Sequence, residues 1–138
     1  MTLAFQSIAI IGKYMNQSAL QLMRKDLLDL AEHLSAKNIR VWVEEETAQH
    51  ANISAYKTAT LSNIGSEVDL VIVMGGDGTM LSVARSLIDF NVPLVGINQG
   101  RFGFLTDLRV EDMLGQLDRI LAGDYVLEPR VILSATVT

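Results

Sequence analysis

Short runs of consecutive apolar residues alternate along this chain with longer segments in which apolar residues recur every three or four positions. Runs of the first kind predict strands that are buried on both faces, and segments of the second kind predict helices that bury one face. The predicted strands are Ser7–Gly12, Ile39–Val43, Leu70–Met74 and Leu94–Ile97, and a further strand is expected within Val131–Thr138.

Three helices are predicted between these strands. The first runs from about Ser18 to Ala36 and begins with a capping box, the second follows the turn after Met74 and ends near Phe90, and the third opens at Glu111 and closes at Gly123. Their expected apolar faces are Leu20, Met23, Leu27, Leu30 and Leu34; Met80, Val83, Ala84, Leu87 and Ile88; and Val110, Met113, Leu114, Leu117, Ile120 and Leu121. Residues 47–66 are polar and poorly patterned, with one short helical piece near Ala48–Ala51.

The alternation of strand and helix determines the predicted fold class. It gives βαβ units, and hence an α/β domain with three Rossmann-like layers: a mostly parallel sheet with helices on both faces. In such sheets ligands bind beyond the carboxyl ends of the strands. The loops that follow the predicted strands are therefore where we expect the functional site.

The most informative loop follows the strand Leu70–Met74 and reads Gly75-Gly76-Asp77-Gly78-Thr79. Glycines after a buried strand allow a tight turn and let a ligand approach the backbone, and the start of the next helix directs N–H groups at the same point. This arrangement is typical of phosphate binding. The simpler alternative is that Asp77-Gly78 is a turn dipeptide and Thr79 a helix N-cap.

Asp77 does not fit a simple phosphate-binding loop, because a carboxylate beside bound phosphates is repelled by them. A metal ion, a proton transfer or a hydroxyl partner has to offset that repulsion. Its position suggests metal or proton chemistry at this turn.

A second unusual loop, Asn98–Asp107, follows the strand Leu94–Ile97. It contains two glycines and the phenylalanines Phe102 and Phe104. This composition suggests backbone contact with a ligand and an aromatic face for a nucleotide base, and the alternative is a glycine turn with its phenylalanines in the core. Because both loops follow strand ends, they are expected at the same edge of the sheet.

Three other features carry weaker signals. Glu44–Glu46 follow the second strand, where dinucleotide folds often hold a ribose, although three successive carboxylates are more often a solvated loop or the first turn of a helix. His33 and His50 have no partner at metal-ligand spacing, and both are interpreted as surface residues.

Composition excludes several classes of function. The net charge is −5 and the 138 residues include no cysteine. An acidic chain is unsuited to binding nucleic acid, and the absence of cysteine removes disulfide frameworks and thiolate chemistry and fits a reducing cytoplasm. With no signal peptide and no membrane-spanning run, the protein is expected to be cytoplasmic and to have no membrane partner.

Two segments together resemble a known family. Gly75–Thr79 is similar to the GGDGT signature shared by NAD kinases, phosphofructokinases and diacylglycerol or sphingosine-type lipid kinases. Gly96–Asp107 resembles the G-[IV]-N-x-G-x-L-G-F-L-T-D segment of bacterial ATP-dependent NAD kinases, with Phe102 where that family usually has leucine. The second segment lacks the Gly-Thr-x-Asn-Asp pattern of the lipid kinases, which with phosphofructokinase-like kinases remain the alternative.

The resemblance implies a role for each matching residue. Asp77 would be the catalytic residue that takes the proton from the adenosine ribose 2′-hydroxyl of NAD as the γ-phosphoryl of ATP arrives, with Mg²⁺ bound to the nucleotide. No side chain is assigned as a metal ligand. The implied residues for binding NAD and ATP are Gly75, Gly76, Asp77, Gly78, Thr79, Asn98, Gly103 and Phe104.

The resemblance also implies a domain organisation. Residues 1–125 would form the N-terminal α/β domain of an NAD kinase, and residues 126–138 the start of a strand that leads into a β-rich C-terminal domain. NAD kinases carry an Asn-Glu motif in that second domain, and no Asn-Glu pair occurs in this chain. We therefore expect a half-site that binds nucleotide weakly alone, and a homo-oligomer, a dimer or tetramer, in the full-length form.

Overall fold

The computed structural model describes residues 5–12, 17–75, 77–98, 108–109, 113–123, 126–127 and 133–134. Along the chain these form β1 (Ser7–Gly12), α1 (Gln17–Ser35), β2 (Arg40–Glu44), α2 (Glu45–Ala51), β3 (Lys57–Ala59), α3 (Leu61–Ile64), β4 (Leu70–Gly75), α4 (Asp77–Leu87), the 3₁₀ turn η1 (Ile88–Phe90), β5 (Leu94–Asn98), β6 (Leu108–Arg109), α5 (Met113–Leu121), β7 (Val126–Leu127) and β8 (Leu133–Ser134).

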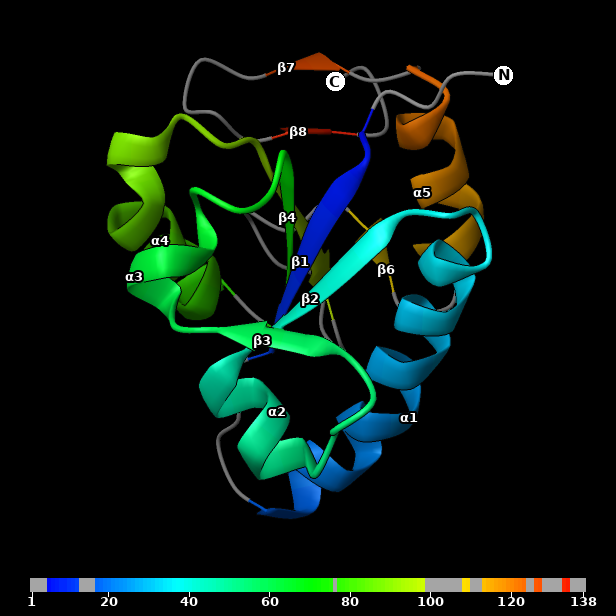
Figure 1. The fold of residues 1–138 in the computed structure, drawn as a ribbon, viewed down its shortest axis with the longest axis vertical. Helices are drawn as coiled ribbons and strands as arrows, with labels where there is room; N and C mark the ends of the chain where they lie inside the picture. The colour runs from blue at the N-terminus through cyan, green and yellow to red at the C-terminus, as the bar shows by residue number, and fades with distance from the viewer. Residues whose placement is uncertain are drawn as a thin grey trace.

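Six of these strands form one sheet in the order β3-β2-β1-β4-β5-β6, and every neighbouring pair is parallel. The strand order reverses at β1 and β4, so the chain winds outward from the middle of the sheet in both directions (Figure 1). The predicted α/β class is confirmed. β7 and β8 pair antiparallel in a small second sheet.

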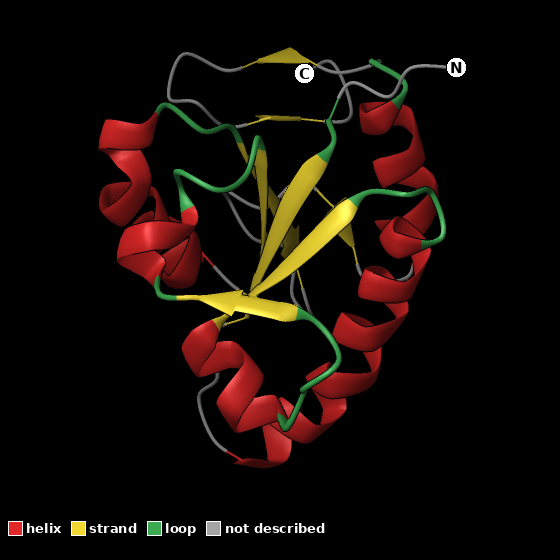
Figure 2. Ribbon diagram, in the orientation of Figure 1, coloured by secondary structure: helices red, strands yellow, loops and turns green. Residues whose placement is uncertain are grey.

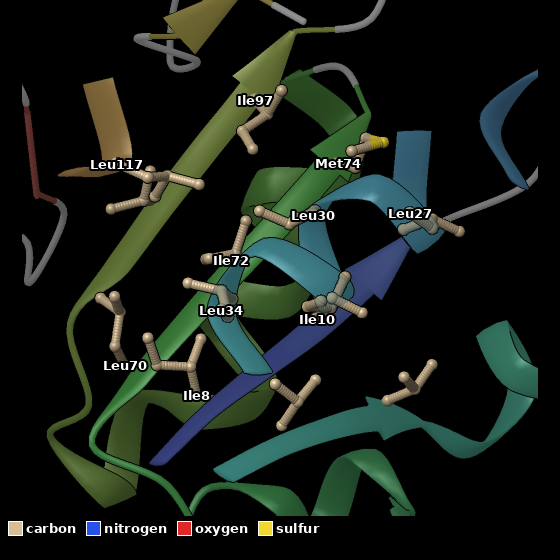
Figure 3. Packing of buried hydrophobic residues seen from close by; sticks show 14 of the residues in the cluster. Ile8, Ile10, Leu27, Leu30, Leu34, Leu70, Ile72, Met74, Ile97 and Leu117 are labelled. Atoms are coloured by element: carbon tan, nitrogen blue, oxygen red, sulfur yellow. The ribbon is translucent and has the colours of Figure 1, made fainter. Parts of the chain in front are cut away.

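Alternate residues of the central strands face two separate cores (Figure 2 shows helices on both sides of the sheet). On one face Ile8 and Ile10 of β1 pack with residues of α1 and α5, and Figure 3 shows this cluster. On the other face Ala9 and Ile11 pack with residues of α3 and α4. Burying a leucine or isoleucine side chain contributes roughly 1.5–3 kcal/mol, so these two cores fix the position of the sheet relative to its helices.

Several predictions about local structure were wrong in detail. Residues 47–66 contain β3 and α3, which are too short to show a period, and α2 begins earlier than the predicted helical piece. Ile88 was expected on the buried face of the second helix but is 68% exposed, because α4 ends at Leu87 and the tighter 3₁₀ turn changes the direction of the next side chain. In the described part of the chain, no helix has the length and apolar character needed to cross a membrane.

His33 was interpreted as a surface residue, but it joins two helices. Its Nε2 atom lies 2.7 Å from Oδ1 of Asp118 on α5, and Nζ of Lys37 lies 3.3 Å from the same oxygen. Burial raises the pKa of the Asp118 carboxyl, but the hydrogen bonds from His33 and Lys37 outweigh it and the pKa lies below its usual value. His50, as predicted, is exposed.

Replacing Asp118 with asparagine is expected to lower the free energy of unfolding by about 0.5 kcal/mol at neutral pH, because the carboxylate is 44% exposed and its ion pairs are screened by solvent. A carboxyl whose pKa is lower in the folded state stabilises the fold above its unfolded pKa, roughly 4, and loses that effect as the pH falls through the folded pKa. Urea unfolding of both proteins would therefore show a difference at pH 7 that shrinks as the pH falls below about 4. A difference that stays constant on acidification would contradict this role.

Candidate functional site

The carboxyl end of β4 turns directly into α4. β4 ends at Gly75, whose φ of +156° is rarely adopted by residues with a side chain, and α4 begins at Asp77. A Cβ atom at Gly75 would stand 3.0 Å from Oγ1 of Thr79, so the end of the strand lies against the first turn of the helix. The N–H groups of that first turn have no intrahelical partners and are free to bind an anion.

The start of α4 excludes the simpler interpretation of the GGDGT loop. Asp77, Gly78 and Thr79 are all helical residues, and Thr79 is the third residue of α4. Thr79 is therefore no N-cap, and Asp77-Gly78 is no turn dipeptide. The glycine turn is correspondingly shorter than the sequence suggested, because only one residue separates β4 from α4.

Three strands bring the predicted loops to one edge of the sheet. In the β4–β5 register Gly75 lies opposite Asn98, and in the β1–β4 register Met74 lies opposite Gly12. β5 therefore ends next to the start of α4, which confirms that the strands before the two glycine-containing segments end at the same edge. The helix that follows β1 packs on one face of the sheet, and the helix that follows β4 packs on the other. This edge is therefore the switch point at which doubly wound sheets bind ligands.

A small cavity of about 50 Å³ opens at this edge, on the side of the sheet that carries α3 and α4. Its lining residues are Ile11, Gly12, Glu44, Glu46, Leu61, Thr79, Ser82 and Val83. The polar part combines two carboxylates with the hydroxyls of Thr79 and Ser82, and the rest of the wall is apolar. Carboxylates repel phosphate oxygens, so these walls suit hydroxyl groups or a cation better than a bare phosphate.

The predicted site residues fall into three groups. Gly75 ends β4, Gly78 is exposed on the first turn of α4, and Thr79 is half-buried in the cavity wall. Asp77 and Asn98 are placed by their backbones, at the start of α4 and the end of β5. Gly76, Gly103 and Phe104 lie outside the described residues.

The acidic segment after β2 differs from a solvated loop. Glu45 and Glu46 form the first turn of α2, but Glu44 is only 6% exposed and is the N-cap of that helix. Its carboxylate accepts hydrogen bonds from the N–H groups of Glu46 and Thr47, at 2.8 and 3.0 Å. Both carboxylate oxygens of Glu44 therefore cap N–H groups in the first turn of α2.

Thr47 was missed in the sequence. It is fully buried, and its hydroxyl contacts Gly12 of β1 and Glu44. The capping box did not mark it, because that pattern has Ser or Thr at the N-cap and Glu or Gln three residues later, the reverse of Glu44 and Thr47. No local pattern marked its contact with Gly12 either, since the two residues are 35 positions apart.

Within the described residues, no three histidine, aspartate or glutamate side chains gather closely enough to hold a metal ion. Magnesium commonly binds through one or two carboxylates together with substrate phosphates, rather than in an all-protein cage.

The fold and the glycine turn at its switch point define a doubly wound α/β domain of the kind that binds nucleotides. Residues 8–125 match the model of the ATP-NAD kinase N-terminal domain. The chain is 48% identical over 134 residues to an NAD kinase of Nitrosomonas europaea and 47% identical over 137 residues to an NAD kinase of Nitrosospira multiformis. The chain belongs to the ATP-NAD kinase family.

These relatives are longer than the chain. The matches cover 97% and 99% of this chain but only 44% and 45% of the respective relatives. The chain thus spans less than half of the length of the curated relatives that it matches. Among solved structures, a yeast NADH kinase in complex with NADH has the same fold, with a TM-score of 0.67 and 19% identity over 84% of this chain and 38% of that one.

Proposed function

We propose that the full-length protein is an ATP-dependent NAD kinase that phosphorylates the 2′-hydroxyl of the adenosine ribose of NAD to give NADP. The observation that carries this proposal is the match of residues 8–125 to the NAD kinase family, with the GGDGT segment at the switch point of the sheet. The neighbouring placement of Gly75 and Asn98 supports one shared site for both family segments.

In this proposal Asp77 accepts the proton of the ribose 2′-hydroxyl. The hydroxyl oxygen forms a bond to the γ-phosphorus of ATP, the bond from that phosphorus to the β–γ bridging oxygen breaks, and ADP leaves. The N–H groups of the GGDGT segment and the Thr79 hydroxyl bind phosphate and ribose oxygens. Magnesium bound to the ATP phosphates neutralises the charge that develops during transfer.

Three further residues complete the proposed nucleotide site. Asn98 holds the second loop or the ligand, and Gly103 and Phe104 approach the nucleotide, with the Phe104 ring against an adenine. The backbone position of Asn98 beside Gly75 supports this assignment, because it starts the second loop next to the phosphate-binding turn.

We also propose that residues 1–125 form the N-terminal domain and that residues 126–138 begin the passage into a β-rich C-terminal domain. The family match that ends at residue 125 supports this boundary, as does the separate pairing of β7 with β8. In the same proposal the full-length protein is a cytoplasmic homo-oligomer, a dimer or tetramer.

The test is an assay of the full-length protein with ATP and Mg²⁺ and, in turn, NAD, diacylglycerol or fructose 6-phosphate. We expect phosphorylation of NAD and at most traces with the other two acceptors. Turnover of the lipid or the sugar phosphate in place of NAD would refute the proposal in favour of another kinase with the same GGDGT segment.

A further inference from the structure

On the side of β2, the last residue of β1 is held by a side chain instead of a strand, whereas β4 pairs with it on the other side. The β1–β2 register runs from Ser7 opposite Arg40 to Ile10 opposite Val43, so Gly12 lies two residues beyond it. The N–H of Gly12 donates a hydrogen bond to Oγ1 of Thr47, at 3.0 Å. Thr47 thus takes the place of a strand partner at the point where β1 reaches the switch point.

Glu44 sets the orientation of that hydroxyl. Its Oε1 atom lies 2.7 Å from Oγ1 of Thr47 and also accepts the hydrogen bond from the Thr47 N–H. The hydroxyl has one proton, and its two acceptors within reach are this carboxylate oxygen and the carbonyl oxygen of Gly12, 3.0 Å away. The lone pairs of the hydroxyl oxygen are thereby left to accept from the Gly12 N–H.

Gly12 is also tightly packed from the side of α1. A Cβ atom at Gly12 would stand only 2.8 Å from the sulfur of Met23. Gly12 and Glu44 both line the cavity that Thr79 and Ser82 of α4 also line. A shift of the end of β1 would therefore change the shape of that cavity directly.

We propose that Thr47, oriented by Glu44, is a positioning residue for nucleotide binding. It fixes Gly12, and with it one wall of the switch-point cavity, at the distance from α4 that a bound nucleotide requires. This inference rests on the proposed NAD kinase function and adds to it a pair of residues outside the GGDGT segment. Neither side chain is required to touch a reacting atom.

The position of Gly12 predicts which kinetic constant changes. The cavity wall contacts a nucleotide in the ground state and in the transition state alike, whereas Asp77 acts on the transferred proton. A substitution that weakens nucleotide binding equally in the ground state and in the transition state raises KM and leaves kcat nearly unchanged. A general loss of stability would instead lower the melting temperature without separating KM from kcat.

The experiment uses the full-length protein with the substitutions Thr47→Val, Thr47→Ser and Glu44→Gln. Valine keeps the shape of the side chain but leaves the buried N–H of Gly12 without its acceptor, so KM for NAD or ATP is expected to rise about 10-fold while kcat changes less than about 3-fold. Serine restores the hydroxyl and is expected to return KM to within about 2-fold of the wild type.

Glu44→Gln is expected to raise the same KM about 3-fold or more, because an amide side chain has only one acceptor oxygen for the contacts that the carboxylate makes. Thr58→Val on the neighbouring strand β3 is the matched control: Thr58 is exposed, and the same chemical change there is expected to leave both constants unaltered. If Thr47→Val does not fold, the comparison of Glu44→Gln with Thr47→Ser decides.

The inference is wrong if Thr47→Val and Glu44→Gln both keep KM for NAD and for ATP within about 2-fold of the wild type, whatever happens to the melting temperature. It is also wrong if Thr47→Ser fails to restore KM. Failure of the proposed function gives a different result, since the wild-type protein itself would then not phosphorylate NAD.

Discussion

Substitution of Asp77 by asparagine in the full-length protein is expected to lower kcat for NAD phosphorylation by about 10²- to 10⁴-fold, the range that a general base supplies. Asparagine has nearly the same shape but cannot take the proton of the ribose hydroxyl. The dissociation constant for NAD, measured by calorimetry, is expected to change little, because the N–H groups of the α4 first turn remain in place.

Asp89→Asn provides the matched control, since Asp89 lies in η1 beyond the far end of α4 and is exposed. The same loss of charge there is expected to leave kcat unchanged. Unchanged turnover in Asp77→Asn would remove this residue from the reaction, whereas loss of NAD binding along with turnover would indicate a role in binding instead.

Gly78→Ala is expected to separate stability from activity. Gly78 is an exposed residue in the first turn of α4, and apart from its chain neighbours and the backbone of its own helix no atom of the described residues lies within 4 Å of the place where its Cβ would stand. Alanine is favoured over glycine within a helix by roughly 0.5–1 kcal/mol, so the melting temperature of the full-length protein should stay the same or rise. The described fold therefore has no need of glycine at this position.

In the proposed function a ligand accounts for that glycine, because a bare backbone allows phosphate or ribose oxygens to approach the start of α4. In the full-length protein kcat/KM for NAD phosphorylation is expected to fall at least about 10-fold, given that a displacement of 1 Å can cost about 10²-fold. Gly115→Ala in α5 is the control, since Gly115 is also exposed in a helix with open space around its Cβ position among the described residues. Full activity in Gly78→Ala would show that no ligand passes close to this residue.

The strongly patterned elements could be predicted from the sequence and the short ones could not. β1, β4 and α1 were predicted within a residue or two of their bounds, because each is long enough for its apolar period to stand out. β3 has three residues and α3 has four. Elements of that length form because neighbouring parts of the fold pack against them, and the local sequence alone does not predict that packing.

The same distinction applies to the candidate site. The glycine turn after β4 could be found because its residues are contiguous, and the common edge of the two loops followed from the fold class. The contacts of Thr47 with Gly12 and of His33 with Asp118 join residues that are 35 and 85 positions apart. Such contacts arise when helices pack on the sheet, so no local sequence pattern predicts them.

The central place of β1 in the sheet has a consequence for synthesis of the protein. One neighbour of β1, β2, follows within a few dozen residues, but the other, β4, starts at Leu70, opposite Ile8. At about 5–20 residues per second, a ribosome needs roughly 3–12 s to make the intervening segment. Throughout that interval one edge of β1 has no strand partner, and its unpaired N–H and C=O groups are open to pairing with another chain.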